Sequence, residues 1–452
     1  MKDLRISKAK SENIMLFLVV VLSFFRFSYF GFSYTPYLDD YTQYLYYPSF
    51  ENPWEKILLK GAGLLSTRPL AGLFDFFLWS RFGQNLGVVV FVMSILYGAS
   101  GVLFFKAFKD LGINLGPIFF AIYLFLPLNA EGTYWISASS RIVVSLFLAS
   151  IAMWAVAKDK TLLFCVFSFL SVWFYEQTAV VSVSLGALTA ILKKSPKILV
   201  FVTVVFLSLL VFYFRFGSLG ENADRLKITA PGEVLKAGLS VLAALADIMG
   251  RINFLIIFKG FIRGFKIIAL DFSFLWISLL LTFCVLFVNF SAVGEETKKQ
   301  TKKQLLIGAA LIFGSLLPFV LAKASFLNLR NMVPLLLGLG IILDFITKKV
   351  FKKYSAVVAG VLIFCFSVSA VSEVSDYNYT AAMDKKAALE IANMIGPGTK
   401  TIKVKITSPP YYPQNAPFGD HIISFTASDW GPSGIVRTIS KNKDVVVDII
   451  DE

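Results

Sequence analysis

Charged residues, histidine and cysteine are all scarce in this 452-residue chain. Asp, Glu, Lys and Arg make up 16% of the sequence, whereas a soluble domain carries about 25%. A single histidine argues against a metal site built on imidazoles. The cysteines Cys165, Cys284 and Cys365 lie in apolar segments, so we expect neither a disulfide framework nor a zinc site. These shortages exclude an ordinary soluble protein.

Hydrophobic residues are correspondingly abundant, at 57% of the chain. They fall into runs of about 15 to 23 residues, the length that crosses a hydrocarbon layer of about 30 Å. The sequence therefore predicts an all-α polytopic membrane protein with about 11 transmembrane helices. The expected spans are roughly 14–33, 86–105, 112–128, 142–157, 161–175, 177–192, 198–216, 268–290, 304–323, 331–347 and 354–371.

Lysine clusters set the expected orientation. They occupy every second loop when the amino terminus is cytoplasmic, as the positive-inside rule requires. The net charge of +14 thus follows from membrane topology, and we expect no nucleic-acid partner. We expect a multi-pass protein of the cell membrane. The clusters are Lys106/Lys109, Lys158/Lys160, Lys193/Lys194/Lys197, Lys298/Lys299/Lys302/Lys303 and Lys348/Lys349/Lys352/Lys353.

Three long or polar loops are then expected on the outer side, together with the carboxy-terminal tail. The loops are 34–85, 129–141 and 217–267. Residues 239–258 are apolar enough for a span, but a span there would place the later lysine clusters outside. We therefore expect amphipathic or interfacial helices in this third loop.

The tail changes character after the last expected span. Residues 1–371 would form the transmembrane domain, and 372–452 a small extracytoplasmic α/β domain. Within the tail we expect a helix over Ala381–Ile395 and strands over Thr401–Thr407 and Val445–Ile450.

Asp39 and Asp40 form an acidic pair just beyond the first expected span. One carboxylate can accept a proton while its neighbour raises the pKa of the pair by like-charge repulsion. The ordinary alternative is a solvated pair of loop acids. A pair of this kind can also bind a divalent metal ion. The sequence leaves open which aspartate would act as the base.

Other polar and aromatic residues are expected on the same side. Arg68 and Arg141 can hold anions or lie at the membrane interface, and Glu131 and Glu176 can orient a hydroxylated ligand. Tyr134 and Trp135 can stack on a sugar or belong to an aromatic belt. Cations in the third outer loop, and one before the tenth span, suit a lipid phosphate or anionic head groups. Those singled out are Arg251, Arg263 and Arg330.

This layout resembles the GT-C glycosyltransferases, polytopic enzymes that use polyprenyl-phosphate sugars as donors. The resemblance covers roughly residues 1–371: an acidic pair at the outer end of the first span, an interfacial loop, and seven spans before a large outer segment. The segment Tyr37-Leu-Asp39-Asp40 with Thr67-Arg68-Pro69 is similar to bacterial members such as the O-antigen glucosyltransferases and related cell-envelope sugar transferases.

The resemblance implies transfer of a sugar from the lipid donor to a hydroxyl of a cell-envelope glycan or lipid-linked acceptor, with inversion. Asp39 or Asp40 would be the base, and Arg68, Arg251, Arg263 and Arg330 are the candidates for the lipid phosphate. No nucleotide or obligatory metal is implied. Two alternatives stay open: a glycan polymerase or ligase, and a lipid or polysaccharide transporter or flippase.

Overall fold

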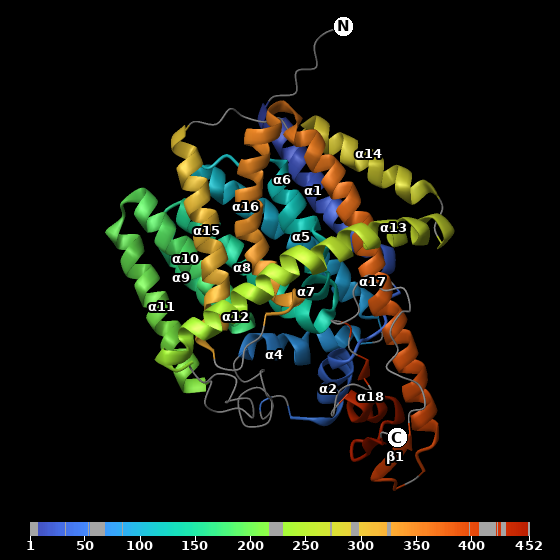
Figure 1. Cartoon of the computed structure of the whole chain (residues 1–452). Helices are drawn as coiled ribbons and strands as arrows, with labels where there is room; N and C mark the ends of the chain where they lie inside the picture. The colour runs from blue at the N-terminus through green and yellow to red at the C-terminus, as the bar shows by residue number, and fades with distance from the viewer. Residues whose placement is uncertain are drawn as a thin grey trace.

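The chain folds into a bundle of long helices with a small unit at one end (Figure 1). The computed structural model describes residues 8–31, 33–52, 54, 68–83, 85–216, 229–271, 274–290, 298–322, 327–396, 398–405, 422, 424–425 and 431–450. Thr67, and residues 217–228 of the expected third loop, lie outside these ranges.

Ten helices follow the expected apolar runs: α1 (Lys8–Gly31), α5 (Gly87–Asp110), α8 (Ile136–Ala157), α9 (Thr161–Phe174), α10 (Glu176–Lys193), α11 (Pro196–Phe216), α14 (Phe274–Phe290), α15 (Lys298–Leu321), α16 (Met332–Phe351) and α17 (Ser355–Asn393). α5 ends at Asp110, and Gly112 just beyond it has a φ of +76°, which lets Ile113 N–H donate to the Phe108 carbonyl. A short 3-10 turn, η10 (Lys352–Tyr354), joins α16 to α17.

The expected span 112–128 is not one helix. It is divided into α6 (Pro117–Phe120), the π-helical η4 (Ala121–Phe125) and the 3-10 turn η5 (Pro127–Asn129). Leu126 has an extended ψ of 122° because the ring of Pro127 disfavours helical geometry at the preceding residue. Every residue from Pro117 to Asn129 is buried, so this segment is core inside the bundle.

Membrane character is supported by helix length and composition. Five helical stretches are long and apolar enough to cross a membrane: Gly87–Asp110, Ile136–Ala157, Pro231–Leu270, Lys302–Leu321 and Leu329–Asn393. Shorter apolar helices cover Thr161–Phe174, Pro196–Ser208 and Leu275–Asn289. The number of spans, about eleven, stays a prediction.

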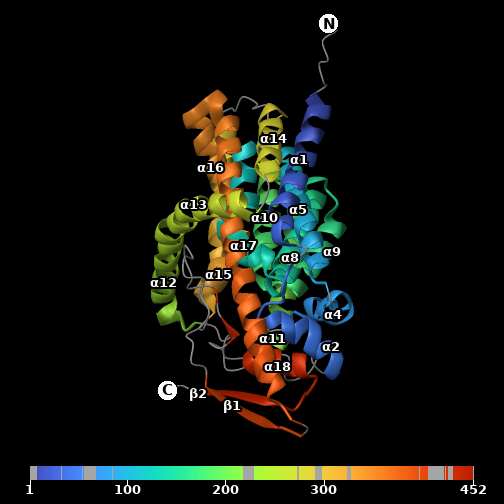
Figure 2. The ribbon, with the colours of Figure 1, turned by 90° about the vertical axis from the view of Figure 1, so that its right-hand side faces the viewer.

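The expected third loop contains a long helical stretch made of η7 (Pro231–Glu233), α12 (Val234–Asp247), η8 (Ile248–Ile252) and α13 (Asn253–Asp271). It crosses the other helices obliquely and packs on α15 and α17 (Figures 1 and 2). Gly260 and Gly264 allow this close approach, because a methyl group on Gly264 would lie 2.0 Å from the Val368 carbonyl oxygen.

Short elements gather at the lower end of the bundle in Figure 1, which we call the site end. They are η1 (Tyr41–Tyr46), α2 (Tyr47–Phe50), α4 (Pro69–Phe77), η3 (Trp79–Phe82), α7 (Ala130–Tyr134) and η9 (Leu329–Asn331). Elements from the expected outer segments 34–85 and 129–141 lie at this end. The helical stretch of the third loop begins near it, and the carboxy-terminal tail lies just beyond it.

The tail forms a small unit below the site end (Figure 2). β1 (Thr401–Lys405) pairs in parallel with β2 (Val446–Ile450), and α18 (Gly431–Ser440) packs between this sheet and η1. The expected boundary at 371/372 falls inside α17, which continues without interruption into the expected helix Ala381–Ile395. The helix continues because apolar and small residues keep one face buried well beyond Val371.

Candidate functional site

The acidic pair lies in a tight turn between α1 and η1. Leu38, directly before Asp39, has a φ of +44°, an unusual conformation for a leucine. Its side chain is buried, and so are those of Tyr37 and Tyr41 on either side of the pair. Strained backbone of this kind persists only where the surrounding packing imposes it. The turn therefore fixes the direction in which the two carboxylates point.

Asp40 is fully buried and accepts three hydrogen bonds. The donors are the Tyr34 hydroxyl, the Tyr37 N–H at 2.9 Å and the Ser137 N–H at 2.9 Å. Burial raises the pKa of Asp40 to about 7, although all three donors lower it. With both oxygens engaged, Asp40 holds the turn against the start of α8.

Asp39 is half-buried, and its surroundings are different. Its carboxylate accepts one long hydrogen bond, 3.4 Å, from the Ser137 hydroxyl. Burial raises the pKa of Asp39, while the positive charges of Arg141 and Arg330 oppose the rise. Asp39 is thus a carboxylate with spare acceptor capacity beside two guanidinium groups.

Arg141 enters this group from α8 and also meets Asp75 of α4. The Arg141 Nη2 to Asp75 Oδ2 distance is 3.6 Å, and both side chains are buried. Burial raises the pKa of Asp75 to about 6. Arg141 Nε and Nη2 find no hydrogen-bond partner within the described part of the chain. Arg141 is therefore a buried cation with an unsatisfied Nε–H, and its charge acts on both Asp75 and Asp39.

Arg330 approaches Asp39 from η9. Its backbone N–H donates to the Glu131 carboxylate at 3.1 Å, whereas its side-chain Nε lies 3.9 Å from the same carboxylate. Its guanidinium carbon lies 5.7 Å from the centre of the Trp135 ring. The side chain is 37% exposed, more than the 9% and 10% of Arg68 and Arg141. Arg330 is therefore the most accessible of these three guanidinium groups.

Arg68 and Glu176, predicted as separate ligand-binding residues, form a two-pronged ion pair with each other. The Arg68 guanidinium also lies 4.7 Å from the centre of the Tyr175 ring. Tyr175 donates to the Asn331 side chain at 2.8 Å, next to Arg330. This pair connects α4 and α10 to η9, and its charges are mutually compensated.

Tyr134 and Trp135 are buried, at 1% and 6% exposure. Trp135 Nε1 donates to the Tyr37 carbonyl at 3.2 Å, and Tyr134 donates to Asn378 at 3.2 Å. The structure therefore places both rings in the packing that supports the acidic turn. Neither presents the open face that the sequence suggested for sugar stacking.

The two arginines of the oblique helical stretch have separate surroundings. Arg251 is exposed and forms a two-pronged pair with Asp247, one turn earlier on the same helix. Arg263 pairs with Asp376, a fully buried residue of α17, and donates to Ser372 at 3.5 Å. No hydrogen bond or ion pair found among the described residues joins either arginine to Asp39.

The site therefore brings Asp39, Asp40, Arg141 and Arg330 together, bordered by Glu131 and the Arg68–Glu176 pair.

Comparison with protein-family models, curated proteins and solved structures finds no match to the chain. A functional argument must accordingly come from the chemistry of the site.

The sequence left open whether Asp39 and Asp40 bind a divalent metal ion. In the ranges that the structure describes, no group of three His, Cys, Asp or Glu side chains is arranged to hold a metal ion. The second oxygen of Asp40 already accepts from Tyr34 and Tyr37.

Sequence reasoning missed Asp75, Asp376 and Tyr377. Asp75 lies in the apolar segment Pro69–Phe77, and an isolated acid in such a segment is itself a signal for a functional or paired group. Asp376 lies in the polar stretch 372–378 of α17, which gives no such signal. Tyr377 contacts Tyr37 edge-on, with ring centres 5.4 Å apart, and only the fold could show that contact.

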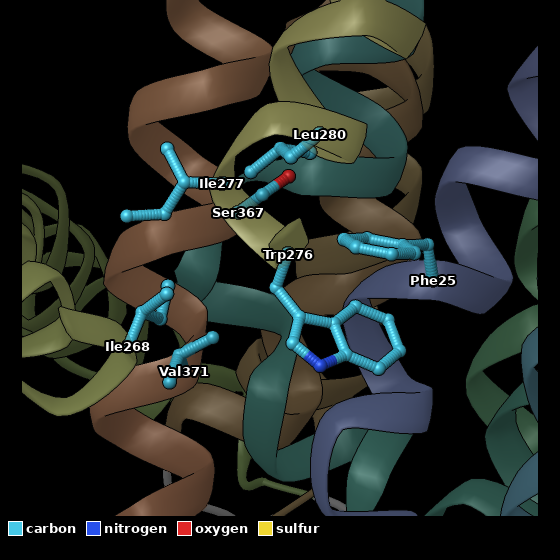
Figure 3. A pocket seen from close by; sticks show the side chains of 7 residues that line it. All are labelled: Phe25, Ile268, Trp276, Ile277, Leu280, Ser367 and Val371. Atoms are coloured by element: carbon cyan, nitrogen blue, oxygen red, sulfur yellow. The ribbon is translucent and has the colours of Figure 1, made fainter. Parts of the chain in front are cut away.

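An apolar groove lies between α1, α13, α14 and α17 (Figure 3). It is a small groove, and the rings of Trp276 and Phe25 form one side of it. The groove is lined by Phe25, Ile268, Trp276, Ile277, Leu280, Ser367 and Val371. Its only polar lining residue is Ser367.

Proposed function

We propose that this chain is a membrane glycosyltransferase that moves a sugar from a polyprenyl-phosphate donor to an acceptor hydroxyl. The observation that carries the proposal is a half-buried carboxylate, Asp39, beside the Arg141 and Arg330 guanidinium groups. A base and an anion-binding site adjacent to each other are what this transfer requires.

Asp39, rather than Asp40, is the proposed base. The acceptor oxygen attacks the anomeric carbon, the bond from that carbon to the phosphate oxygen breaks, and Asp39 takes the acceptor proton. The prenyl phosphate leaves with the bonding electrons, so the anomeric configuration inverts. Asp40 cannot serve as readily because its oxygens are engaged by Tyr34, Tyr37 and Ser137.

Arg330 and Arg141 are the proposed phosphate ligands. Arg330 is more accessible than Arg68, whose charge is compensated by Glu176. Arg141 has unused N–H donors in a buried position. Both cations would stabilise the negative charge that develops on the leaving phosphate.

The apolar groove supports a prenyl chain as the rest of the donor. Its lining is apolar, and Arg263 and Lys266 precede Ile268 on the same helix. A prenyl phosphate that carries a photoactivatable group at the far end of its chain is expected to label the peptide containing Trp276. Labelling should fall when unlabelled prenyl phosphate competes.

The proposal is tested with the purified protein in lipid nanodiscs, synthetic prenyl-phosphate hexoses and a lipid-linked glycan that supplies the acceptor hydroxyl. We expect release of prenyl phosphate and stabilisation of the protein against heat by prenyl phosphate itself. Asp39→Asn should stop release and keep the heat stabilisation, whereas Arg330→Ala should weaken both. Arg251→Ala is the control, because this exposed arginine forms an ion pair with Asp247 on its own helical stretch. Full turnover by Asp39→Asn would contradict the assignment and favour a glycan ligase.

A further inference from the structure

The π-helix η1 begins directly after Asp40 and is poorly supported by its own side chains. Tyr41 Oη, Thr42 Oγ1 and Gln43 Oε1 are all buried, and within the described residues none has a hydrogen-bond partner. π-helical turns are rare and occur often at functional sites. Some other element must therefore hold η1 in this conformation.

α18 of the carboxy-terminal unit makes those contacts. The Thr438 hydroxyl is 3.4 Å from the Tyr41 carbonyl, and Tyr46 donates to the Lys443 carbonyl at 3.4 Å. The Arg437 guanidinium carbon lies 5.9 Å from the centre of the Tyr46 ring. Residues about 400 positions apart thus meet beside the acidic turn.

The closest approach is at Gly434. A methyl group there would lie 2.6 Å from Thr42 Oγ1, shorter than real side chains tolerate. α18 is itself fixed to the sheet, because Val447 N–H donates to Ser433 at 3.0 Å and Arg437 donates to the Val445 carbonyl at 2.6 Å. The surface facing η1 is therefore backed by the whole unit.

We propose that the carboxy-terminal unit is a positioning element of the site, in which α18 holds η1 and thereby the Asp39 carboxylate in its reactive place. This inference rests on the proposed role of Asp39. A displacement of about 1 Å in a catalytic group can cost on the order of 100-fold in rate. Gly434 is the positioning residue that permits the contact.

Gly434→Ala provides the first test, with hydrogen–deuterium exchange of the full chain in nanodiscs as the readout. We expect faster exchange in peptides covering residues 37–46, with unchanged exchange in α8 and α16. The turnover number for prenyl-phosphate hexose should fall at least 10-fold while KM changes little, because the cations that bind the phosphate are untouched.

The double variant Thr42→Ala with Gly434→Ala removes the colliding hydroxyl and should restore both slow exchange and turnover. Gly396→Ala is the matched control, since its new methyl group meets nothing closer than 3.8 Å. If Gly434→Ala unfolds the chain, Thr438→Val offers a milder change at the same contact.

Unchanged exchange over residues 37–46 in Gly434→Ala would overturn the proposal. The proposal would also be overturned if the double variant exchanged as fast and turned over as slowly as Gly434→Ala. If Gly434→Ala exchanges faster but the wild-type protein transfers no sugar, only the proposed function is contradicted. Hydrogen–deuterium exchange reports the contact between α18 and η1 without any reaction.

Discussion

Asp39 and Asp40 are adjacent in sequence and have opposite surroundings. Asp40 is enclosed by donors from three residues, whereas Asp39 has one long hydrogen bond and two arginines nearby. Asp39 and Asp40 follow Leu38 in a helical turn, where consecutive side chains point in different directions, so only Asp40 reaches the N–H groups of Tyr37 and Ser137. Two adjacent aspartates thus differ in their surroundings: Asp40 is fully hydrogen-bonded, and Asp39 is half-buried with one long hydrogen bond.

Alanine at each aspartate should separate these roles. Asp39→Ala is expected to lower turnover of prenyl-phosphate hexose about 100-fold to 10,000-fold, because a general base contributes that much. Its unfolding temperature should stay near that of wild type. Asp40→Ala should cost about 1–3 kcal/mol for each buried donor it leaves unpaired. Thermal unfolding in detergent measures the difference, and equal losses of stability would contradict it.

The buried acids also predict how stability depends on pH. Burial raises the pKa values of Asp40 to about 7 and of Asp75 to about 6, so the folded state binds these protons more tightly than the unfolded state. The free energy of unfolding should therefore fall by a few kcal/mol as pH rises from about 4 to about 7, and then level off. Asp75→Asn should remove the contribution of Asp75 alone, so the decline below about pH 6 should become shallower while the contribution of Asp40 remains. A rise in unfolding temperature over that range would contradict the assignment.

At the scale of elements, apolar runs were a reliable guide to where helices lie, because burying a long apolar surface requires them. Ten of the expected runs are occupied mainly by one long helix. The run 112–128 is helical only from Pro117 to Phe125 before the short turn η5, and the expected boundary at 371/372 falls inside α17. The Arg68–Glu176 pair and the Gly434–Thr42 contact join distant segments, and such contacts leave no local pattern in a sequence.

The crossing of α13 over α17 depends on small residues. Gly264→Ala should destabilise the protein by about 1–3 kcal/mol, because its methyl group would meet the Val368 carbonyl. Gly250→Ala is the control on the same helical stretch, with nothing within 4 Å of the added methyl group. It should be neutral or stabilise slightly, since alanine favours helix over glycine. Unfolding temperatures in detergent compare the two variants, and equal stabilities would contradict the close packing.

For the whole molecule, the lysine pattern predicts sidedness. The junction of α16 and α17 lies at one end of the bundle and the carboxy-terminal unit at the other (Figure 1). Lys353 belongs to η10 at this junction, and Asn442 lies between α18 and β2. In a variant lacking the native cysteines, a membrane-impermeant maleimide applied to intact cells should label Asn442→Cys and not Lys353→Cys. Permeabilised cells are the control, in which both should react. Labelling of Lys353→Cys alone in intact cells would reverse the orientation.

α17 is a single helix of 39 residues, about 58 Å long, roughly twice the thickness of a hydrocarbon layer. The same rod passes the bundle, contacts the acidic turn through Tyr377 and carries the carboxy-terminal unit. A thinner bilayer tilts such a rod, and a tilt would move Tyr377 and α18 together. The activity of this protein should therefore respond to the acyl-chain length of the surrounding lipid, as a sensor of membrane thickness would.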